Sequence, residues 1–255
     1  MKKQLSIPGL FARSTLVPIL ALLLLMGVAE LLLFRHALNV ALTAYEADVG
    51  FGMISLEQLI KQSRISLCFG AAFLLITLLL CLPGCEFRTR TGYTWRRLSV
   101  SAKAIFLWQF AYNTLIYLLL AACQTLLVYG LCRGYLAAAP AEWIGNQTLF
   151  LAFWRNEHLH ALLPLSDIAL WIRNLLMLLS LGLASAIFPL KQREQRYSGS
   201  IIAMAVFCLF TFHRGIADIS HAVIAFVVLF MVLCELLSFV LTRNQEEEEE
   251  EGDHA

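Results

Sequence analysis

Charged residues are scarce in this chain. Asp, Glu, Lys and Arg make up only 15% of its 255 residues, whereas soluble domains carry about 25%. Hydrophobic residues account for 60% of the sequence, and the mean hydropathy is +0.74. This composition excludes an ordinary soluble domain and indicates a membrane protein. The net charge of +1 is too small to indicate a nucleic-acid partner, and none is expected.

Motifs for nucleotide hydrolysis and for metal-dependent catalysis are also lacking. The sequence contains no Gly-Lys-Ser or Gly-Lys-Thr, so it has no P-loop with which to hydrolyse ATP. The closest pair of histidines, His158 and His160, is two residues apart and would lie on opposite faces of a helix. That spacing differs from the His-Glu-x-x-His order of zinc proteases. We therefore expect neither enzymatic activity nor a cofactor.

The seven cysteines form an odd set, and most of them lie within apolar runs. This distribution excludes a disulfide framework of the kind found in small secreted domains. Cys81 and Cys85 have a spacing that could face one metal ion on a helix, but Pro83 and Gly84 stand between them and no second pair follows. We expect packing cysteines here and no metal site.

The sequence does contain long apolar runs. A helix needs about 20 apolar residues to cross the hydrocarbon core of a membrane, because its backbone must satisfy its own hydrogen bonds there. Six runs meet or approach this length, which predicts an all-α fold: one transmembrane domain over residues 1–242 with six helices. The fifth is the weakest, being short and ending at His213. The expected spans are 16–34, 65–82, 104–132, 168–190, 200–212 and 222–241.

The distribution of Lys and Arg predicts the orientation of these spans. If the N-terminus lies inside, twelve basic residues fall on the cytoplasmic side and six on the other, as the positive-inside rule requires. Both termini are therefore expected in the cytoplasm. The first apolar run continues past Ala29, too far for a typical signal peptide. We expect an amphipathic segment over residues 1–15 that leads into an uncleaved first span.

Three charged residues lie within the expected spans, where each costs at least a few kcal/mol. By depth, Glu30 and Arg173 could pair across a helix interface, whereas Glu235 lies too close to the cytoplasm for either. A structural ion pair is one interpretation of these residues, and a polar path or gate for a substrate is the other. The tight turn between the last two spans is either a polar cap or an external gate. Its polar residues are His213, Arg214, Asp218 and His221.

The remaining connections suggest less. The aromatic segment 142–156 favours a short interfacial amphipathic helix over a ligand platform, because Trp and Phe settle at membrane surfaces. The segment 41–63 mixes acidic with apolar residues and predicts an ordered outer cap. The tail over residues 243–255 is a block of acidic residues that is expected to stay solvated and disordered, with cation binding as the alternative.

A cationic, aromatic segment connects the second and third spans. In "TGYTWRRLSVSAKAIFLWQF", residues 91–110, helical spacing places Trp95, Leu98 and Ala102 on one face and turns the arginines toward water or lipid phosphate. A positive-inside anchor would explain the arginines alone. The segment as a whole predicts an amphipathic helix that leads into the third span.

With this segment, the chain resembles the ABC-2 type permeases, which are membrane subunits of ATP-binding-cassette exporters. Leu98-Ser99-Val100-Ser101 and Lys103 match the short turn and the Lys that these permeases carry before their third span, with Ser99 where Pro is frequent. The resemblance implies a bacterial cytoplasmic membrane, a separate ATPase partner, and a second copy or a related permease. It also implies that residues 91–103 form the segment on which the ATPase acts. The implied coupling residues are Tyr93, Trp95, Arg96, Arg97, Leu98, Ser99 and Lys103.

A second hypothesis is a membrane protein that transports nothing, such as a sensor, an assembly factor or a scaffold. The same cationic segment would then anchor the chain to lipid. An intramembrane enzyme is a third hypothesis, but the sequence offers no paired catalytic residues for it.

Overall fold

The described part of the chain is all-helical, as the sequence predicts. The computed structural model describes residues 2–47, 54–83, 102–165, 167–193 and 198–214, together with scattered positions between 223 and 240. No strand occurs among these residues. The elements are α1 (Lys2–Ala47), α2 (Leu56–Gln62), α3 (Ile65–Cys81), α5 (Ala102–Ala138), η1 (Ala141–Trp143), α6 (Thr148–Arg155), α7 (Glu157–Leu162), α8 (Ile168–Arg193) and α9 (Ser200–Arg214).

Three of these helices, α1, α5 and α8, are long and apolar enough to cross a membrane. They coincide with the first, third and fourth expected spans. A fourth crossing results if α2 and α3, which are bent by 50° at their junction, count as one span. The bend lies at Arg64, whose φ of 53° is unusual for a residue other than glycine. The fifth expected span corresponds to the 15 residues of α9, and the sixth is described only at scattered positions.

Helix α1 extends well beyond the expected first span, 16–34. Its 46 residues form one continuous helix, so the amphipathic segment 1–15 is the beginning of that helix and not a separate element. No Gly or Pro interrupts the sequence between Gly27 and Ala47, and Ala and Leu favour helix there. At 1.5 Å per residue α1 is about 69 Å long, more than twice the roughly 30 Å of a hydrocarbon core. A hydrocarbon core of that thickness would therefore leave part of α1 outside it.

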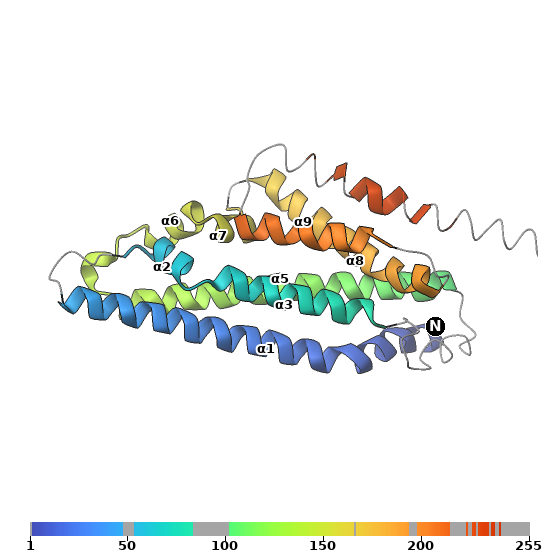
Figure 1. The fold of residues 1–255 in the computed structure, drawn as a ribbon, viewed down its shortest axis with the longest axis horizontal. Coiled ribbons are helices and arrows are strands. Elements are labelled where there is room, and N and C mark those ends of the chain that lie inside the picture. Colours follow the sequence, from blue (N-terminus) through green and yellow to red (C-terminus); the bar gives the residue numbers. More distant parts are fainter. Residues whose placement is uncertain are drawn as a thin grey trace, which may run out of the picture.

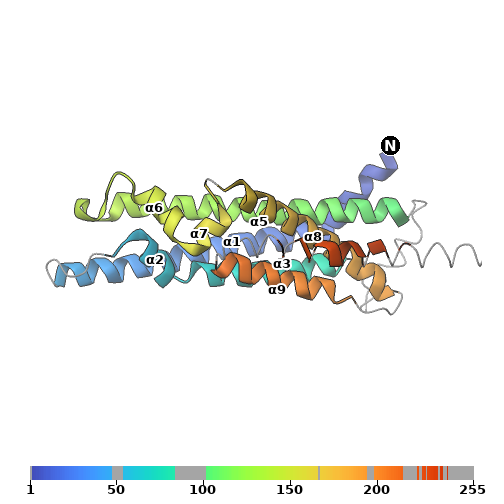
Figure 2. The same ribbon diagram turned by 90° about the horizontal axis from the view of Figure 1, so that it is seen from above.

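The long helices lie side by side in an elongated bundle (Figures 1 and 2). Helices α1 and α5 run in the same direction, and α3 and α8 run in the opposite direction. The N-terminus of α1, the end of α3 and the beginning of α5 therefore lie at one end of the bundle (Figure 1). We call this the basic end, because it also adjoins the arginine-rich residues 84–101, which themselves lie outside the described residues.

A second group of elements covers the other end of the bundle. We call it the cap; it consists of residues 34–47 of α1, α2, residues 128–138 of α5, η1, α6 and α7. Its own hydrophobic cluster includes Phe34, Leu59, Tyr135 and Phe153, separate from the cluster that runs along α1, α3, α5, α8 and α9. A polar residue begins helix α7 of this group. The Oδ1 atom of Asn156 accepts a hydrogen bond from the Leu159 amide and so acts as the N-cap of α7.

The cap contains both of the segments that were expected outside the membrane. Segment 41–63 contributes the end of α1 and α2, and segment 142–156 contributes α6, with α2 and α6 packed together. Phe153 of α6 is buried in the cap, while Phe150 and Trp154 stack on each other at its surface with ring centroids 6.0 Å apart. The aromatic segment therefore divides its side chains between a core and an exposed face.

Candidate functional site

The first polar contact within the bundle joins α1 to α5. Glu30 is completely buried, and its Oε2 atom accepts a hydrogen bond of 3.1 Å from Nε2 of Gln124, which is also completely buried. Among the described residues, Glu30 Oε1 and Gln124 Oε1 have no hydrogen-bond partner. A buried carboxyl group with a single hydrogen bond is costly in an apolar surrounding, which makes this pair a candidate for function.

A second polar contact ties α8 to α7. Arg173 and Asn174 are both buried, and Nε and Nη2 of Arg173 donate to Asn174 Oδ1 at 3.3 and 3.0 Å. Asn174 Nδ2 in turn donates to the carbonyl oxygen of Ala161 in α7 at 2.7 Å. Arg173 also interacts electrostatically with Asp167, just before α8. The guanidinium group thus helps to fix the cap to the bundle.

The ion pair that the sequence allowed between Glu30 and Arg173 is not formed. The one hydrogen bond of Glu30 goes to Gln124, and its Oε1 atom has no partner. The depth of two residues along their own helices does not determine whether those helices present them to each other. Glu235 lies outside the described residues, so its part in a polar path stays a prediction.

A third polar contact involves α7 and α9. The Nδ1 atom of buried His158 lies 2.7 Å from the carbonyl oxygen of Phe212, and the imidazole packs against the ring of Phe69 at 5.7 Å. Its Nε2 atom is buried without a partner among the described residues. Burial lowers the pKa of His158, and the nearby His213 lowers it further, against the opposing effect of the Phe212 carbonyl. The uncharged imidazole is therefore favoured.

His158 also borders a polar pocket of about 300 Å³ at the junction of the cap with α9. Lys61, Glu157 and His213 line the same pocket. Of the four expected gate residues, only His213 is placed there. Arg214 is the last residue of α9 and its side chain is not described, and Asp218 and His221 lie outside the described residues.

The structure describes only the C-terminal end of the expected coupling segment, 91–103. Tyr93, Trp95, Arg96, Arg97, Leu98 and Ser99 lie outside the described residues. Lys103 is the second residue of α5, and its side chain is not described. The last two residues of the segment are therefore the first two of α5, at the basic end of the bundle (Figure 1).

Sequence reasoning missed several polar residues that join neighbouring helices. Gln124, Asn174 and the Asn113–Ser185 pair, in which Asn113 Nδ2 donates to Ser185 Oγ at 2.8 Å, all connect neighbouring helices. Each is an amide or hydroxyl within an apolar run, and such residues often join helices in membranes. The uncharged polar residues within the apolar runs could have indicated which positions join neighbouring helices.

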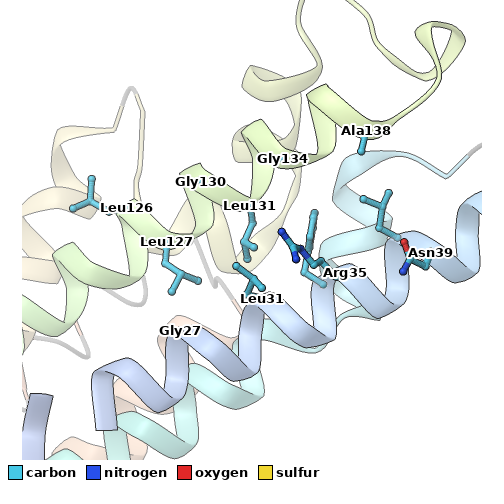
Figure 3. Close-up of a pocket in the computed structure, with 12 residues that line it drawn as sticks. Gly27, Leu31, Arg35, Asn39, Leu126, Leu127, Gly130, Leu131, Gly134 and Ala138 are labelled. Carbon is cyan, nitrogen blue, oxygen red and sulfur yellow. The ribbon is translucent and has the colours of Figure 1, made fainter. Parts of the chain in front are cut away.

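An open groove between α1 and α5 was also missed. It has a volume of about 740 Å³ and extends along α1 from Gly27 to Asn39 and along α5 from Leu126 to Ala138 (Figure 3). Small residues spaced like Gly130, Gly134 and Ala138 on one face of a helix usually indicate a close approach of two helices. In the structure this face of α5 borders open space instead.

The described residues contain no group of three or more His, Cys, Asp and Glu side chains that could hold a metal ion. Neither a family model, nor a curated protein, nor a solved structure matches this chain. Its interpretation therefore depends on its own residues and geometry.

Proposed function

We propose that this chain is the membrane-spanning permease subunit of an ATP-binding-cassette transporter, with an exporter as the expected direction. In this proposal the chain crosses a bacterial cytoplasmic membrane six times with both termini in the cytoplasm. A separate ATPase acts on residues 91–103, and two copies, or this chain and a related permease, line the path. The absence of a P-loop from the sequence is consistent with an ATPase on another chain.

The observation that carries this proposal is the continuity of α5. This single helix begins at the cationic segment, at Ala102, and carries Gln124, the hydrogen-bond partner of Glu30. The two positions are about 33 Å apart along the helix. Helix α5 packs against α1, α3 and α8, so a displacement of its first turn would be transmitted to the contacts of Glu30 and of Ser185. One rigid helix thus connects the segment on which the ATPase would act with buried polar contacts of the bundle. This arrangement suits a transporter whose membrane helices are moved by an ATPase on one side of the membrane.

The buried polar groups support the same proposal. Charged and amide side chains inside a membrane are costly and commonly mark the path of a substrate or an ion. Here Glu30, Gln124, Arg173 and Asn174 are buried close to the boundary between bundle and cap. The cap would then cover the outer end of the path.

Co-purification of the full-length chain from native membranes tests the proposal. We expect an ATPase of the ATP-binding-cassette class to co-purify and to hydrolyse ATP. The combined substitutions Arg96→Ala, Arg97→Ala and Leu98→Ala should remove it. The matched control is Arg133→Ala, Arg155→Ala and Leu165→Ala, which changes the same residue types at exposed positions of the cap region; this variant should keep the ATPase.

Two results would count against a permease: a wild-type chain that purifies without any ATPase, or a 96–98 variant that keeps every partner. Either would favour a sensor, an assembly factor or a scaffold, for which the cationic segment only binds lipid.

A further inference from the structure

The groove between α1 and α5 lies between two polar contacts of α1. At one of them Gln124 of α5 donates a hydrogen bond to Glu30. At the other, just beyond the end of α5, the hydroxyl of Tyr45 donates to Glu142 Oε2 of η1 at 2.6 Å. Between them the helices stand apart along one side, which leaves the open volume of about 740 Å³. This volume is in the roughly 300–1,000 Å³ range of small-molecule sites.

Glycines determine where the groove closes and where it opens. A Cβ atom on Gly27 would lie 2.8 Å from Cδ1 of Leu127, so the helices approach closely at this end. A Cβ atom on Gly130 or Gly134 would find no atom within 4 Å. The groove is therefore unfilled by the chain over about one turn of α5 (Figure 3).

The groove is apolar near its closed end and polar near the cap. Leu31 and Leu126 border the closed end and are exposed, with Leu126 71% exposed. Arg35 and Asn39 border the other end, and Figure 3 shows the Arg35 guanidinium group between α1 and α5. Of the 12 residues that line the groove, Arg35 is the only charged one, and none is acidic.

This arrangement has the polarity and length of one membrane leaflet. The apolar run of α1 ends at Phe34, so Arg35 is expected at the level of lipid head groups. From Gly27 to Asn39 the groove is about 18 Å long, which compares with about 15 Å for half of a hydrocarbon core. An acyl chain fits the apolar end, and a guanidinium group binds phosphate oxygens in a bidentate manner.

We propose that this groove binds an anionic phospholipid of the leaflet on the cap side, with its phosphate on Arg35 and Asn39, in the open space beside Gly130 and Gly134, and an acyl chain that extends toward Leu31 and Leu126. The proposal requires that α1 and α5 lie in a membrane. It is independent of any ATPase, because the groove lies toward the cap, away from Ala102, where α5 begins.

Native mass spectrometry of the full chain, reconstituted with phosphatidylglycerol or with phosphatidylcholine and then released from the bilayer, tests the proposal. We expect the wild-type chain to retain phosphatidylglycerol in preference to phosphatidylcholine. Arg35→Glu should lower retention of phosphatidylglycerol roughly tenfold, since a charge-assisted contact is lost and repulsion is added. The double variant Gly130→Leu, Gly134→Leu should retain neither lipid, because leucine side chains would fill the groove.

Arg133→Glu is the matched control. This exposed arginine lies on α5 but does not line the groove, so its charge reversal should leave retention unchanged. Asn39→Asp provides a second variant, if Arg35→Glu fails to fold, and should also weaken retention of phosphatidylglycerol. Equal retention of both lipids by the wild-type chain would overturn the proposal. So would a double leucine variant that keeps its lipid, or one that only converts a dimer into a monomer.

Discussion

Glu30 on α1 and Gln124 on α5 form one of two hydrogen-bonded side-chain contacts between these parallel helices among the described residues. The other joins Thr15 to Tyr112. The partners are separated in sequence by 97 residues at Thr15 and by 94 residues at Glu30. Because the separation changes by less than one turn of helix, the two helices keep nearly one register over about 15 residues of α1, roughly 22 Å. Beyond the end of α5, Tyr45 of α1 donates a hydrogen bond to Glu142 of η1.

Loss of the amide donor should destabilise the bundle more than loss of both polar groups. Gln124→Leu leaves the buried Glu30 carboxyl without its one hydrogen bond, and we expect a cost of about 1–3 kcal/mol. Glu30→Leu combined with Gln124→Leu replaces both groups by apolar side chains of similar size and should restore most of that loss. Thermal unfolding of the single and double variants in detergent measures the difference. A double variant as unstable as the sum of the single ones would contradict this account.

Gly182 of α8 should tolerate no larger residue. A Cβ atom at this position would overlap Oγ1 of Thr114 and lie 3.1 Å from both Cβ and the backbone N of the same residue. We expect Gly182→Ala to separate α8 from α5 and to cost about 1–3 kcal/mol in thermal unfolding. Adding Thr114→Ala should recover part of the loss. Gly130→Ala, at an open position, is the control and should leave stability nearly unchanged.

The stability of the cap should fall as the pH falls through the titration of His158. Burial, with a smaller contribution from His213, holds the pKa of this imidazole below its ordinary value of 6.5. In the window between 6.5 and the lower folded value, the unfolded chain binds more protons than the folded one. The stabilisation is therefore complete above about pH 6.5 and is lost as the pH drops through that window.

Thermal unfolding between pH 5 and pH 8 measures this dependence. His158→Gln, which keeps a donor for the Phe212 carbonyl, should flatten the curve. The pocket also contains Lys61 and Glu157, so these residues stay unchanged in both proteins. His36→Gln, a substitution of an exposed histidine on α1, should keep the wild-type slope. A curve that His158→Gln leaves unchanged would show that another group titrates.

The two ends of α1 should face opposite sides of the membrane. Arg13 and Glu46 are both exposed and are about 50 Å apart along the helix, farther than the thickness of a hydrocarbon core. In a cysteine-free background, a membrane-impermeant maleimide should label Glu46→Cys on intact cells and Arg13→Cys only after permeabilisation. The reverse pattern would place the basic end outside and would contradict the proposed orientation.

The end of α1 shows why hydropathy predicted spans better than it predicted helices. The unbroken apolar run stops at Phe34, and the expected span stopped with it, yet the helix continues to Ala47. Beyond Phe34, polar residues are mixed with Ala and Leu, which favour helix, and Leu38 and Ala41 pack into the cap. A span boundary depends on lipid contact, whereas a helix boundary depends on local propensity and on packing.

The sequence by itself determined that this protein is helical and that at least three of its helices are suited to a membrane. A backbone surrounded by lipid must bond to itself, so a long apolar run permits little besides helix. It also identified Glu30 and Arg173 as costly buried groups. Only the tertiary structure decided their partners, because the choice of Gln124 and Asn174 depends on which helices are neighbours and in which register. The cap and the groove beside Arg35 have the same origin, since both arise where helices distant in sequence meet or separate.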